Sequence, residues 1–499
     1  MTYKSYRRNI MHIAFLNPQG NFDAHDSYWT EHPDFGGQLV YVKELSIALS
    51  TLGHKVDIIT RQIVDNSWPE FAQTIDSYPG IDNVRIIRIP CGGENFLAKE
   101  QLWPYLREYV QGIIDFYEQE DTFPAVVTTH YGDGGLSGVL LQKRKNIPFT
   151  FTGHSLGAQK MDKLNVNEDN FNTLTDHYNF HLRIIAERLA MNRANKIIVS
   201  TSQERFQQYN HRLYNGAIDV KDDNKFSVIP PGVNTDIFNG QYNHKLQKKV
   251  DKYLQRDLKQ NRLHLPCLIS ASRLDQKKNH LGLVKAFANS EKLQENANLV
   301  ITLRGIENPF NDYTDASKEE REILADILNI YKKYQLEGKI SMFPLNSQQE
   351  LAEFYGYMKE RKSVFTLTSF YEPFGLAPIE AMSSGLPVAI TENGGPLEIT
   401  DHGKYGILID PENPENIAQS LLKLLTNKNK WHHYQQQGKK RVLAKYTWQK
   451  TAEKYYQLLK NLKFHENKGN KLPVADYYLN PNKNNEDKML KAFKYLWQK

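Results

Sequence analysis

A pair of cationic side chains is the first feature of the sequence with an evident chemistry. Arg273 and Lys278 stand in the polar segment 272–279, which follows an apolar run beginning at Cys267. A planar guanidinium and the point charge of an ammonium could converge on a diphosphate. A solvated charged loop has the same composition, but this segment falls at a strand end, where α/β sheets bind their ligands. The position therefore favours a diphosphate site.

Two carboxylates form a second group. Glu372 and Glu380 have seven residues between them. Such a pair has no functional meaning by itself, because glutamates are common on protein surfaces. The intervening Pro373-Phe374-Gly375 makes the stretch distinctive, and we expect Glu380 on a short helix, facing back over its amino end.

Two loops that follow apolar runs complete the set. Gly36 and Gly37 precede a helical pattern, so their backbone N–H groups could approach a phosphate with the helix dipole favouring the anion. An ordinary tight turn would look the same, and both interpretations stay open. His154 follows a strand pattern at residues 149–152. A lone histidine is more often structural, but the presence of the other three groups favours a functional one.

Alternating apolar runs and amphipathic stretches must position these groups. In the first half, the runs predict parallel strands with helices between them, at residues 12–17, 55–60, 84–89, 125–130, 149–152, 196–201 and 226–229. In the second half, the pattern continues at residues 267–274, 299–303, 339–344, 364–369, 387–391 and 406–409. Turn residues at 230–234 and the Lys-rich segment 245–259 separate the two series and predict a hinge. We therefore expect two doubly wound α/β domains that face each other across a deep cleft.

Composition and charge argue against several classes of protein. The apolar fraction of 40% and the charged fraction of 24% are typical of soluble globular chains, and no apolar run reaches the roughly 18 residues of a membrane span. The net charge of +6 is spread among acidic residues, without a basic stripe for nucleic acid. The apolar run 11–16 is too short for a signal peptide, and Cys91 and Cys267 lack a zinc or redox spacing. We expect a cytoplasmic protein that binds neither nucleic acid nor membrane.

Several segments together resemble those of the sucrose-phosphate synthases in their compact bacterial form. The stretch 372–380 is similar to the Glu-x7-Glu motif of retaining glycosyltransferases with the GT-B fold. The other segments that carry the resemblance are residues 17–20, 35–42, 130–135, 152–159, 230–233 and 272–279. The resemblance covers nearly the whole chain. It implies an acceptor-binding Rossmann-like domain over residues 1–232, a nucleotide-sugar-binding one over 233–447, and a helical segment over 448–499 that crosses back onto the first.

The resemblance also implies how the nucleotide is held. Arg273 and Lys278 would bind the diphosphate of UDP-glucose and stabilise it as a leaving group. Glu380 would bind the ribose hydroxyls, and Arg304 would border the uracil and ribose. The backbone of Gly37 would meet the phosphates.

The donor glucose would be held by side chains and by backbone. Glu372 would lie near the sugar, and His154 would contact its 6-hydroxyl, as an orienting group more than a base. Backbone N–H groups of four consecutive residues would meet the sugar hydroxyls. They are Phe374, Gly375, Leu376 and Ala377.

The phosphorylated acceptor needs a basic pocket on the first domain. Lys99, Lys160 and Arg183 match the positions that supply it in the bacterial enzyme, although each could equally be a surface charge. Gln38 and the backbone of Gly36 would touch the fructose ring, and His154 is a third residue expected to bind the acceptor.

The implied reaction makes sucrose 6-phosphate and UDP with retention of configuration. An oxocarbenium-like centre forms and the departing phosphate oxygen takes the proton, so catalysis comes from positioning and charge stabilisation and needs no protein nucleophile. The chain contains no Asp-x-Asp, and we expect no cofactor and no catalytic metal, although a metal could stimulate the reaction. A sucrose-phosphate phosphatase would act downstream on the product.

Other functions stay open at this point. A sucrose synthase would share the donor site but use free fructose, which the basic trio argues against. A different donor, such as an ADP- or GDP-sugar, is compatible with the same motifs. A non-catalytic nucleotide-sugar sensor should have lost one of the five donor-site residues, and all are present. Recruitment to a surface through the Lys-rich tail would need a basic face that acidic residues interrupt.

Overall fold

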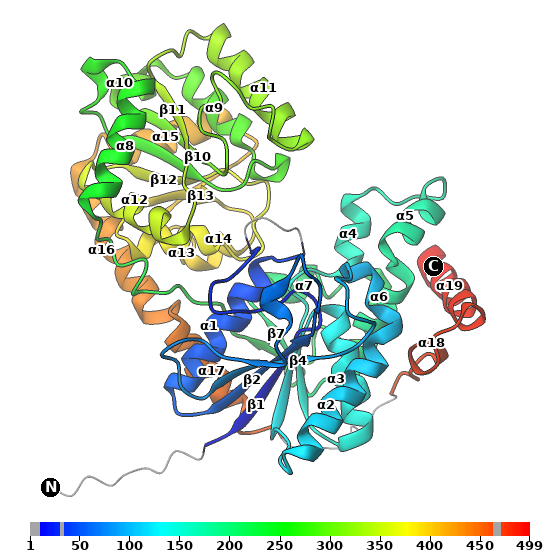
Figure 1. Cartoon of the computed structure of the whole chain (residues 1–499). Helices are drawn as coiled ribbons and strands as arrows, with labels where there is room; N and C mark the ends of the chain where they lie inside the picture. The colour runs from blue at the N-terminus through cyan, green and yellow to red at the C-terminus, as the bar shows by residue number, and fades with distance from the viewer. Residues whose placement is uncertain (1–9, 30–33, 463–470) are drawn as a thin grey trace, which may run out of the picture. The chain divides into compact units, whose positions relative to one another are not determined.

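The computed structural model describes residues 10–29, 34–462 and 471–499. These residues form two compact units. The first unit extends to Ile229 and resumes at Thr451, and the second is Pro230–Lys450. Each unit is an α/β domain built on one sheet, as the ribbon in Figure 1 shows.

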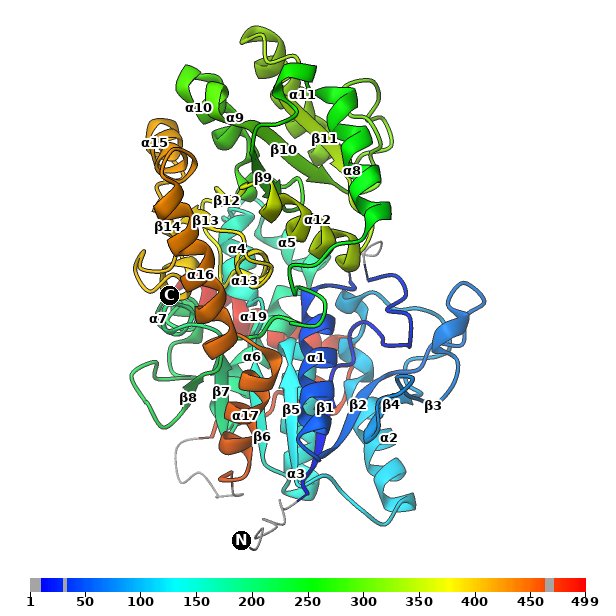
Figure 2. The same ribbon diagram turned by 90° about the vertical axis from the view of Figure 1, so that its left-hand side faces the viewer.

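The first unit contains an eight-stranded sheet in the order β3-β4-β2-β1-β5-β6-β7-β8 (Figure 2). Its strands are β1 (His12–Leu16), β2 (Lys55–Arg61), β3 (Ile75–Asp76), β4 (Val84–Ile89), β5 (Val126–His130), β6 (Phe149–Thr152), β7 (Lys196–Val199) and β8 (Phe226–Val228). Strand β3 pairs antiparallel with β4, and the other pairs in the described sheet are parallel. Strands β5 and β6 are buried along their whole length, because helices cover both faces of the sheet.

Two layers of helices cover this sheet. Helices α2, α3 and α6 pack on one face through a continuous apolar core, and α1 and α17 cover the other face (Figure 1). The α-helices are α1 (Gly37–Thr51), α2 (Leu106–Gln119), α3 (Tyr131–Lys145), α4 (Gly157–Lys163), α5 (Phe171–Tyr178), α6 (Phe180–Arg193), α7 (Ser202–Gln207), α17 (Trp448–Leu459), α18 (Asp476–Leu479) and α19 (Lys483–Gln498). The short 3-10 helices are η1 (Pro69–Phe71), η2 (Lys99–Gln101), η3 (Trp103–Tyr105) and η4 (Arg212–Tyr214).

The second unit repeats the architecture with a six-stranded parallel sheet in the order β11-β10-β9-β12-β13-β14. Its strands are β9 (Cys267–Ala271), β10 (Asn298–Leu303), β11 (Ile340–Pro344), β12 (Val364–Leu367), β13 (Val388–Thr391) and β14 (Ile407–Ile409). Separate apolar cores lie on its two faces, one under α8, α12, α13 and α16 and the other under α9, α10, α11 and α15. Its helices are α8 (His244–Asp257), α9 (His280–Ala288), α10 (Glu291–Asn296), α11 (Lys318–Lys333), α12 (Gln348–Glu360), α13 (Leu376–Ser383), α14 (Gly395–Ile399), α15 (Pro414–Leu425), α16 (Lys428–Lys445), η5 (Gln260–Arg262) and η6 (Gln276–Lys278).

The C-terminal helices belong to the first unit. In α17, the phenol of Tyr455 lies 2.6 Å from the hydroxyl of Thr128 in β5. In α18, Tyr478 donates a hydrogen bond to the backbone of α6, and in α19 the ring of Phe493 stacks on Phe171 at 5.9 Å. The chain therefore returns to the first domain, which confirms the predicted crossing of the C-terminal segment.

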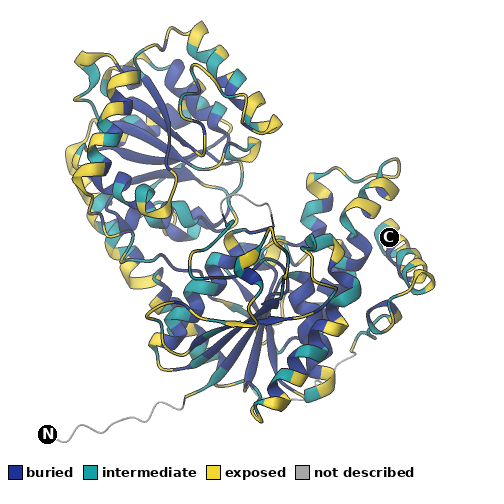
Figure 3. Cartoon of the chain, viewed as in Figure 1, coloured by how far each residue is buried: buried dark blue, intermediate teal, exposed yellow. Residues whose placement is uncertain are grey.

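The two predicted doubly wound sheets are confirmed, with two local corrections. The Lys-rich segment 245–259 is not part of a hinge: most of it is helix α8, whose Leu246, Val250 and Leu254 are buried at helical spacing. The two-residue strand β3 was not predicted, because so short an edge strand has no readable period. In both units, most strand residues are buried and the outer helix faces are exposed, with Ile75 of β3 and Val228 of β8 as exposed exceptions (Figure 3). Among the described residues, no helix combines the length and apolarity needed to cross a membrane.

Candidate active site

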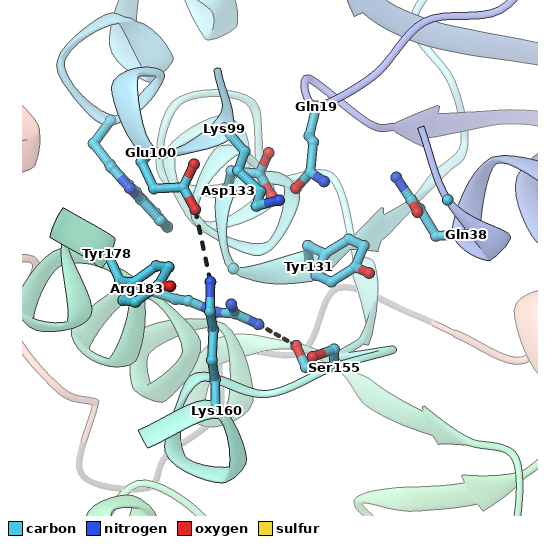
Figure 4. Close-up of a pocket in the computed structure, with 13 residues that line it drawn as sticks. Gln19, Gln38, Lys99, Glu100, Tyr131, Asp133, Ser155, Lys160, Tyr178 and Arg183 are labelled. Carbon is cyan, nitrogen blue, oxygen red and sulfur yellow. Dashed lines mark hydrogen bonds and ion pairs between the residues drawn. The ribbon is translucent and has the colours of Figure 1, made fainter. Parts of the chain in front are cut away.

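A pocket of about 250 Å³ lies at the carboxyl edge of the sheet in the first unit (Figure 4). It is built from the loop before α1, from η2, from the start of α3 and from α4 to α6. All five residues predicted for the acceptor, other than His154, line it. They are Gly36, Gln38, Lys99, Lys160 and Arg183. The structure therefore brings together three cationic side chains that are far apart in the sequence.

Lys99 joins two walls of the pocket. Its ammonium lies 2.5 Å from the Asp34 carboxylate, and its backbone N–H donates to the same carboxylate at 3.2 Å. Asp34 immediately precedes the phenylalanine of the Phe35-Gly36-Gly37 loop, so the ion pair ties this loop to the start of η2.

Arg183 is fixed by a carboxylate that the sequence did not single out. Its Nε donates to Glu187 Oε1 at 2.9 Å, and its guanidinium also donates to the carbonyl of Ser155. Glu187 is fully buried and accepts the N–H of Gly157 at 2.9 and 3.0 Å, and the hydroxyl of Tyr214. One carboxylate thus holds both Arg183 and the amino end of α4. The spacing of four residues on a helix was the signal available for this pair.

Lys160 has weaker protein partners than the other two cations. Its Nζ lies 3.8 Å from Glu100 Oε1 and 3.7 Å from the centroid of the Tyr178 ring (Figure 4). Burial lowers the pKa of Lys160 to about 8, with the positive charges of Arg183 and Lys99 adding to the shift and Glu100 opposing it. An anion in the pocket would reverse that shift, because it favours the charged ammonium.

Asp133 is a pocket residue that sequence reasoning missed. Its carboxylate is buried at the start of α3, and Oδ2 has no hydrogen-bond partner among the described residues. Burial raises the pKa of Asp133 to about 6. An unsatisfied buried carboxylate oxygen is costly, so a ligand hydroxyl is a fitting partner for it. Asp133 lies within residues 130–135, one of the segments that carry the family resemblance, and this was the sign in the sequence that it could belong to the site.

Gly36 and Gly37 form the amino end of α1. Gly36 is the extended N-cap residue and Gly37 is the first residue of the helix. Among the described residues, a Cβ atom added at Gly37 would meet nothing within 4 Å. The first N–H groups of a helix lack intrahelical partners and could donate to a phosphate, and the contact at Gly37 stays a prediction.

His154 lies next to the pocket residue Ser155 but is not among the residues that line the pocket. Its φ of 53° places it in the left-handed region, between β6 and α4. Its Nε2 lies 2.7 Å from Nδ1 of His130. Burial lowers the pKa of His154 to about 3, so the imidazole is neutral at pH 7. A neutral ring in a fixed orientation agrees with the predicted orienting role.

In the second unit, the predicted donor residues follow neighbouring strands. Arg273 follows β9, Arg304 follows β10 and Glu372 follows β12, so all three lie at the carboxyl edge of one sheet. Burial, together with the positive charge of Arg273, lowers the pKa of Arg304. The ammonium of Lys278 lies 2.6 Å from Glu372 Oε2.

The glutamate stretch has the backbone geometry that its glycines predict. Gly375 has a φ of 108° and caps α13, so the N–H groups of residues 375–377 stand in the first turn of a helix, without intrahelical partners. The backbone of Glu372 lies close to Gly394, because a Cβ atom added at Gly394 would clash with the carbonyl of Glu372. Glu380 lies in α13 as predicted, and burial raises its pKa to about 7, opposed by a hydrogen bond from Gln348.

Comparisons with known proteins identify the family. The family described as "Sucrose synthase first GT-B domain" matches residues 5–257, and "Glycosyl transferases group 1" matches residues 251–441. The probable sucrose-phosphate synthase of Thermosipho melanesiensis is 45% identical over 450 residues, covering 90% of this chain and 96% of that protein. The sucrose-phosphate synthase of Spinacia oleracea is 30% identical over 515 residues, covering 90% of this chain but 47% of the plant protein, so the chain spans about half of that relative.

Solved structures agree in fold. A sucrose-phosphate synthase from Thermosynechococcus elongatus superposes with a TM-score of 0.64 at 22% identity, covering 90% of this chain and 98% of that one. The Anabaena protein HepE in complex with UDP and glucose gives a TM-score of 0.59 at 14% identity, covering 91% and 100%. These likenesses show the GT-B fold. The relative at 45% identity and the two matching family models show that the chain is a glycosyltransferase that belongs to the sucrose-phosphate synthase family.

Proposed function

We propose that this glycosyltransferase moves glucose from UDP-glucose to D-fructose 6-phosphate, releasing sucrose 6-phosphate and UDP with retention of configuration. The observation that carries the proposal is the convergence of Lys99, Lys160 and Arg183 on one pocket of the first unit. Three cations around a space of about 250 Å³ suit the phosphate of a sugar phosphate. Polar lining groups such as Gln38 and Asp133 suit the hydroxyls of its ring.

On the donor side, the second unit supplies the charge that a departing diphosphate needs. Arg273 and Lys278 would bind the diphosphate oxygens, and the ion pair with Glu372 holds Lys278 in place before binding. Two cations directed at the diphosphate would stabilise it as it leaves, so the proposed reaction requires no metal. The diphosphate oxygen takes the proton of the acceptor hydroxyl, while the neutral His154 hydrogen-bonds the sugar. HepE, which shares the fold, binds UDP and glucose, and this supports a nucleotide-sugar donor.

Sucrose synthase activity is the second candidate, because the matching family description for residues 5–257 is that of a sucrose synthase domain. It would use free fructose and leave the three cations without a phosphate. The product of the proposed reaction, in contrast, carries a phosphate ester, so a phosphatase would act on it downstream.

The preferred acceptor sugar distinguishes the two candidate activities. Initial rates are measured with UDP-glucose and either fructose 6-phosphate or fructose, in chelator, for the wild type and Lys160→Ala. The wild type should strongly prefer the phosphorylated sugar, and the variant should raise its KM about 10- to 100-fold, the effect of losing a hydrogen bond to a charged group. Lys143→Ala, an exposed lysine on α3, is the control and should change KM less than twofold. Equal use of free fructose by the wild type would assign sucrose synthase activity instead.

The pH dependence of acceptor binding gives a separate prediction. In the empty pocket the pKa of Lys160 is about 8, and a bound phosphate raises it. The affinity for fructose 6-phosphate is therefore highest below pH 8, where Lys160 is charged. It falls as the pH rises above 8, by up to about tenfold per pH unit. The KM for fructose 6-phosphate should be flat from pH 7 to 8 and rise towards pH 9.5. Lys160→Arg, which stays charged, should flatten the profile, and a flat profile in the wild type would contradict the assignment.

A further inference from the structure

A buried chain of hydrogen bonds leads from His154 to the C-terminal helix α17. His154 Nε2 lies 2.7 Å from His130 Nδ1, and His130 Nε2 lies 3.3 Å from the hydroxyl of Thr128. That hydroxyl lies 2.6 Å from the phenol of Tyr455, which is also 3.1 Å from the hydroxyl of Thr150. Apart from His154, each of these side chains is at most 1% exposed. The chain therefore reaches solvent only at His154 among these five side chains.

The sheet explains why these groups meet. Alternation along β5 and β6 sends Thr128, His130 and Thr150 to the face that α1 and α17 cover, opposite the apolar core under α2, α3 and α6. The ring of His130 stacks on Phe15 of β1 at 5.6 Å and 9°. Tyr41 of α1 lies edge-on to His154 at 5.1 Å. Both imidazoles are therefore held in orientation by rings as well as by hydrogen bonds.

The protonation states of the two histidines limit which atom can donate in each hydrogen bond. Burial lowers the pKa of His130 well below its usual range and that of His154 to about 3, so each ring is neutral and carries one N–H, and only one of the two facing nitrogens, His130 Nδ1 and His154 Nε2, can be protonated. A phenol is the stronger donor at the far end, and its shortest contact is with Thr128. If Tyr455 donates to Thr128, the Thr128 hydroxyl donates to His130 Nε2, and His130 carries its own proton on Nδ1.

We propose that His130 is a positioning residue which holds His154 in one ring orientation with its proton on Nδ1. His130 Nδ1–H donates to His154 Nε2, so His154 offers Nδ1–H to a ligand oxygen and acts as a donor. Tyr455 fixes the direction of the chain from the far end. The identity of that ligand oxygen as a hydroxyl of the donor sugar rests on the proposed function, whereas the position of the proton does not.

The proton is tested directly by nitrogen NMR of protein labelled with 15N in its histidine rings. The signals of His154 are assigned as those lost in His154→Gln. The proposal requires the protonated nitrogen of His154 to be Nδ1 in the wild type, without any substrate present. A proton on Nε2 of His154 would overturn it. This result is independent of which reaction the enzyme catalyses.

Two replacements of His130 test its effect on turnover. His130→Phe keeps a ring against Phe15 but removes both nitrogens, whereas His130→Asn keeps an amide nitrogen near the place of Nδ1. We expect kcat to fall about 10- to 100-fold in His130→Phe, with the acceptor KM within about twofold, and to recover most of this loss in His130→Asn. Tyr455→Phe, which removes the donor at the far end, should lower kcat by an intermediate factor.

If His130 only stabilised the fold, the variants would show a different pattern of kcat and melting temperature. Phe15→Leu disturbs the ring stack and leaves the hydrogen bond, so it should lower the melting temperature but keep kcat within about threefold. Equal losses in His130→Phe and His130→Asn, or a comparable loss of kcat in Phe15→Leu, would overturn the positioning role. If the wild type fails to use UDP-glucose and fructose 6-phosphate at all, the proposed function fails, and the NMR result still decides the proton.

Discussion

Replacing Lys278 by alanine is expected to lower kcat about 100- to 1,000-fold, the effect of removing one group that stabilises developing charge. Lys278 lies at the carboxyl edge of the second sheet with its ammonium 2.6 Å from Glu372, so it is already in place when a diphosphate arrives. The loss should appear as slower release of UDP at saturating concentrations of both substrates, because the cation matters most when the bond to the diphosphate breaks.

Two further variants separate this effect from damage to the loop. Lys277→Ala removes the neighbouring exposed lysine, whose backbone carbonyl accepts the N–H of Phe370, and it should keep kcat within about twofold. Lys278→Ala combined with Glu372→Gln removes the unpaired carboxylate as well, and it should not restore the rate. A rate close to that of the wild type in Lys278→Ala would remove this residue from the chemistry.

Replacing Glu187 by alanine is expected to lower the free energy of unfolding by about 3–5 kcal/mol, because this fully buried carboxylate holds the guanidinium of Arg183, whose side chain is 15% exposed, together with the N–H of Gly157 and the hydroxyl of Tyr214. It also frees the amino end of α4, which carries Lys160. The measurement is urea-induced unfolding followed by circular dichroism, together with the KM of each substrate. The KM for the sugar phosphate should rise at least tenfold, and that for the nucleotide sugar should stay within about twofold.

An exposed ion pair provides the matched control. Glu118 pairs with Lys145 at 2.5 Å, but its side chain is 54% exposed. Surface pairs of this kind contribute about 0–1 kcal/mol, so Glu118→Ala should barely change stability or either KM. If Glu187→Ala proved as mild as Glu118→Ala, the buried carboxylate would not be the anchor of the acceptor pocket.

The positions of the strands and the identity of the site loops could be predicted because both depend on local sequence. A buried parallel strand is a short apolar run, and the runs that precede Arg273, His154 and Glu372 end where the ligand edge of a sheet must lie. The polar composition of the Lys-rich segment 245–259 suggests a linker, but its apolar residues Leu246 and Val250 repeat at helical spacing and are buried in α8.

The supporting residues could not be predicted, since their roles depend on contacts across the fold. His130 meets His154 across neighbouring strands, and Glu187 reaches the N–H of Gly157 from a different helix. Neither the buried carboxylate of Asp133 nor the phenol of Tyr455 has a local pattern that distinguishes it from an ordinary core residue. Their importance follows from burial and from the few partners that the folded chain gives them.

The most direct test of the account is the identity of the product. The wild type is incubated with UDP-glucose and fructose 6-phosphate in chelator, and the products are identified by mass spectrometry and by the anomeric signals in NMR. The account predicts UDP and sucrose 6-phosphate with the α-configuration of the donor glucose retained. No transfer to the phosphorylated sugar, an inverted linkage, or preferential formation of unphosphorylated sucrose from free fructose would contradict it.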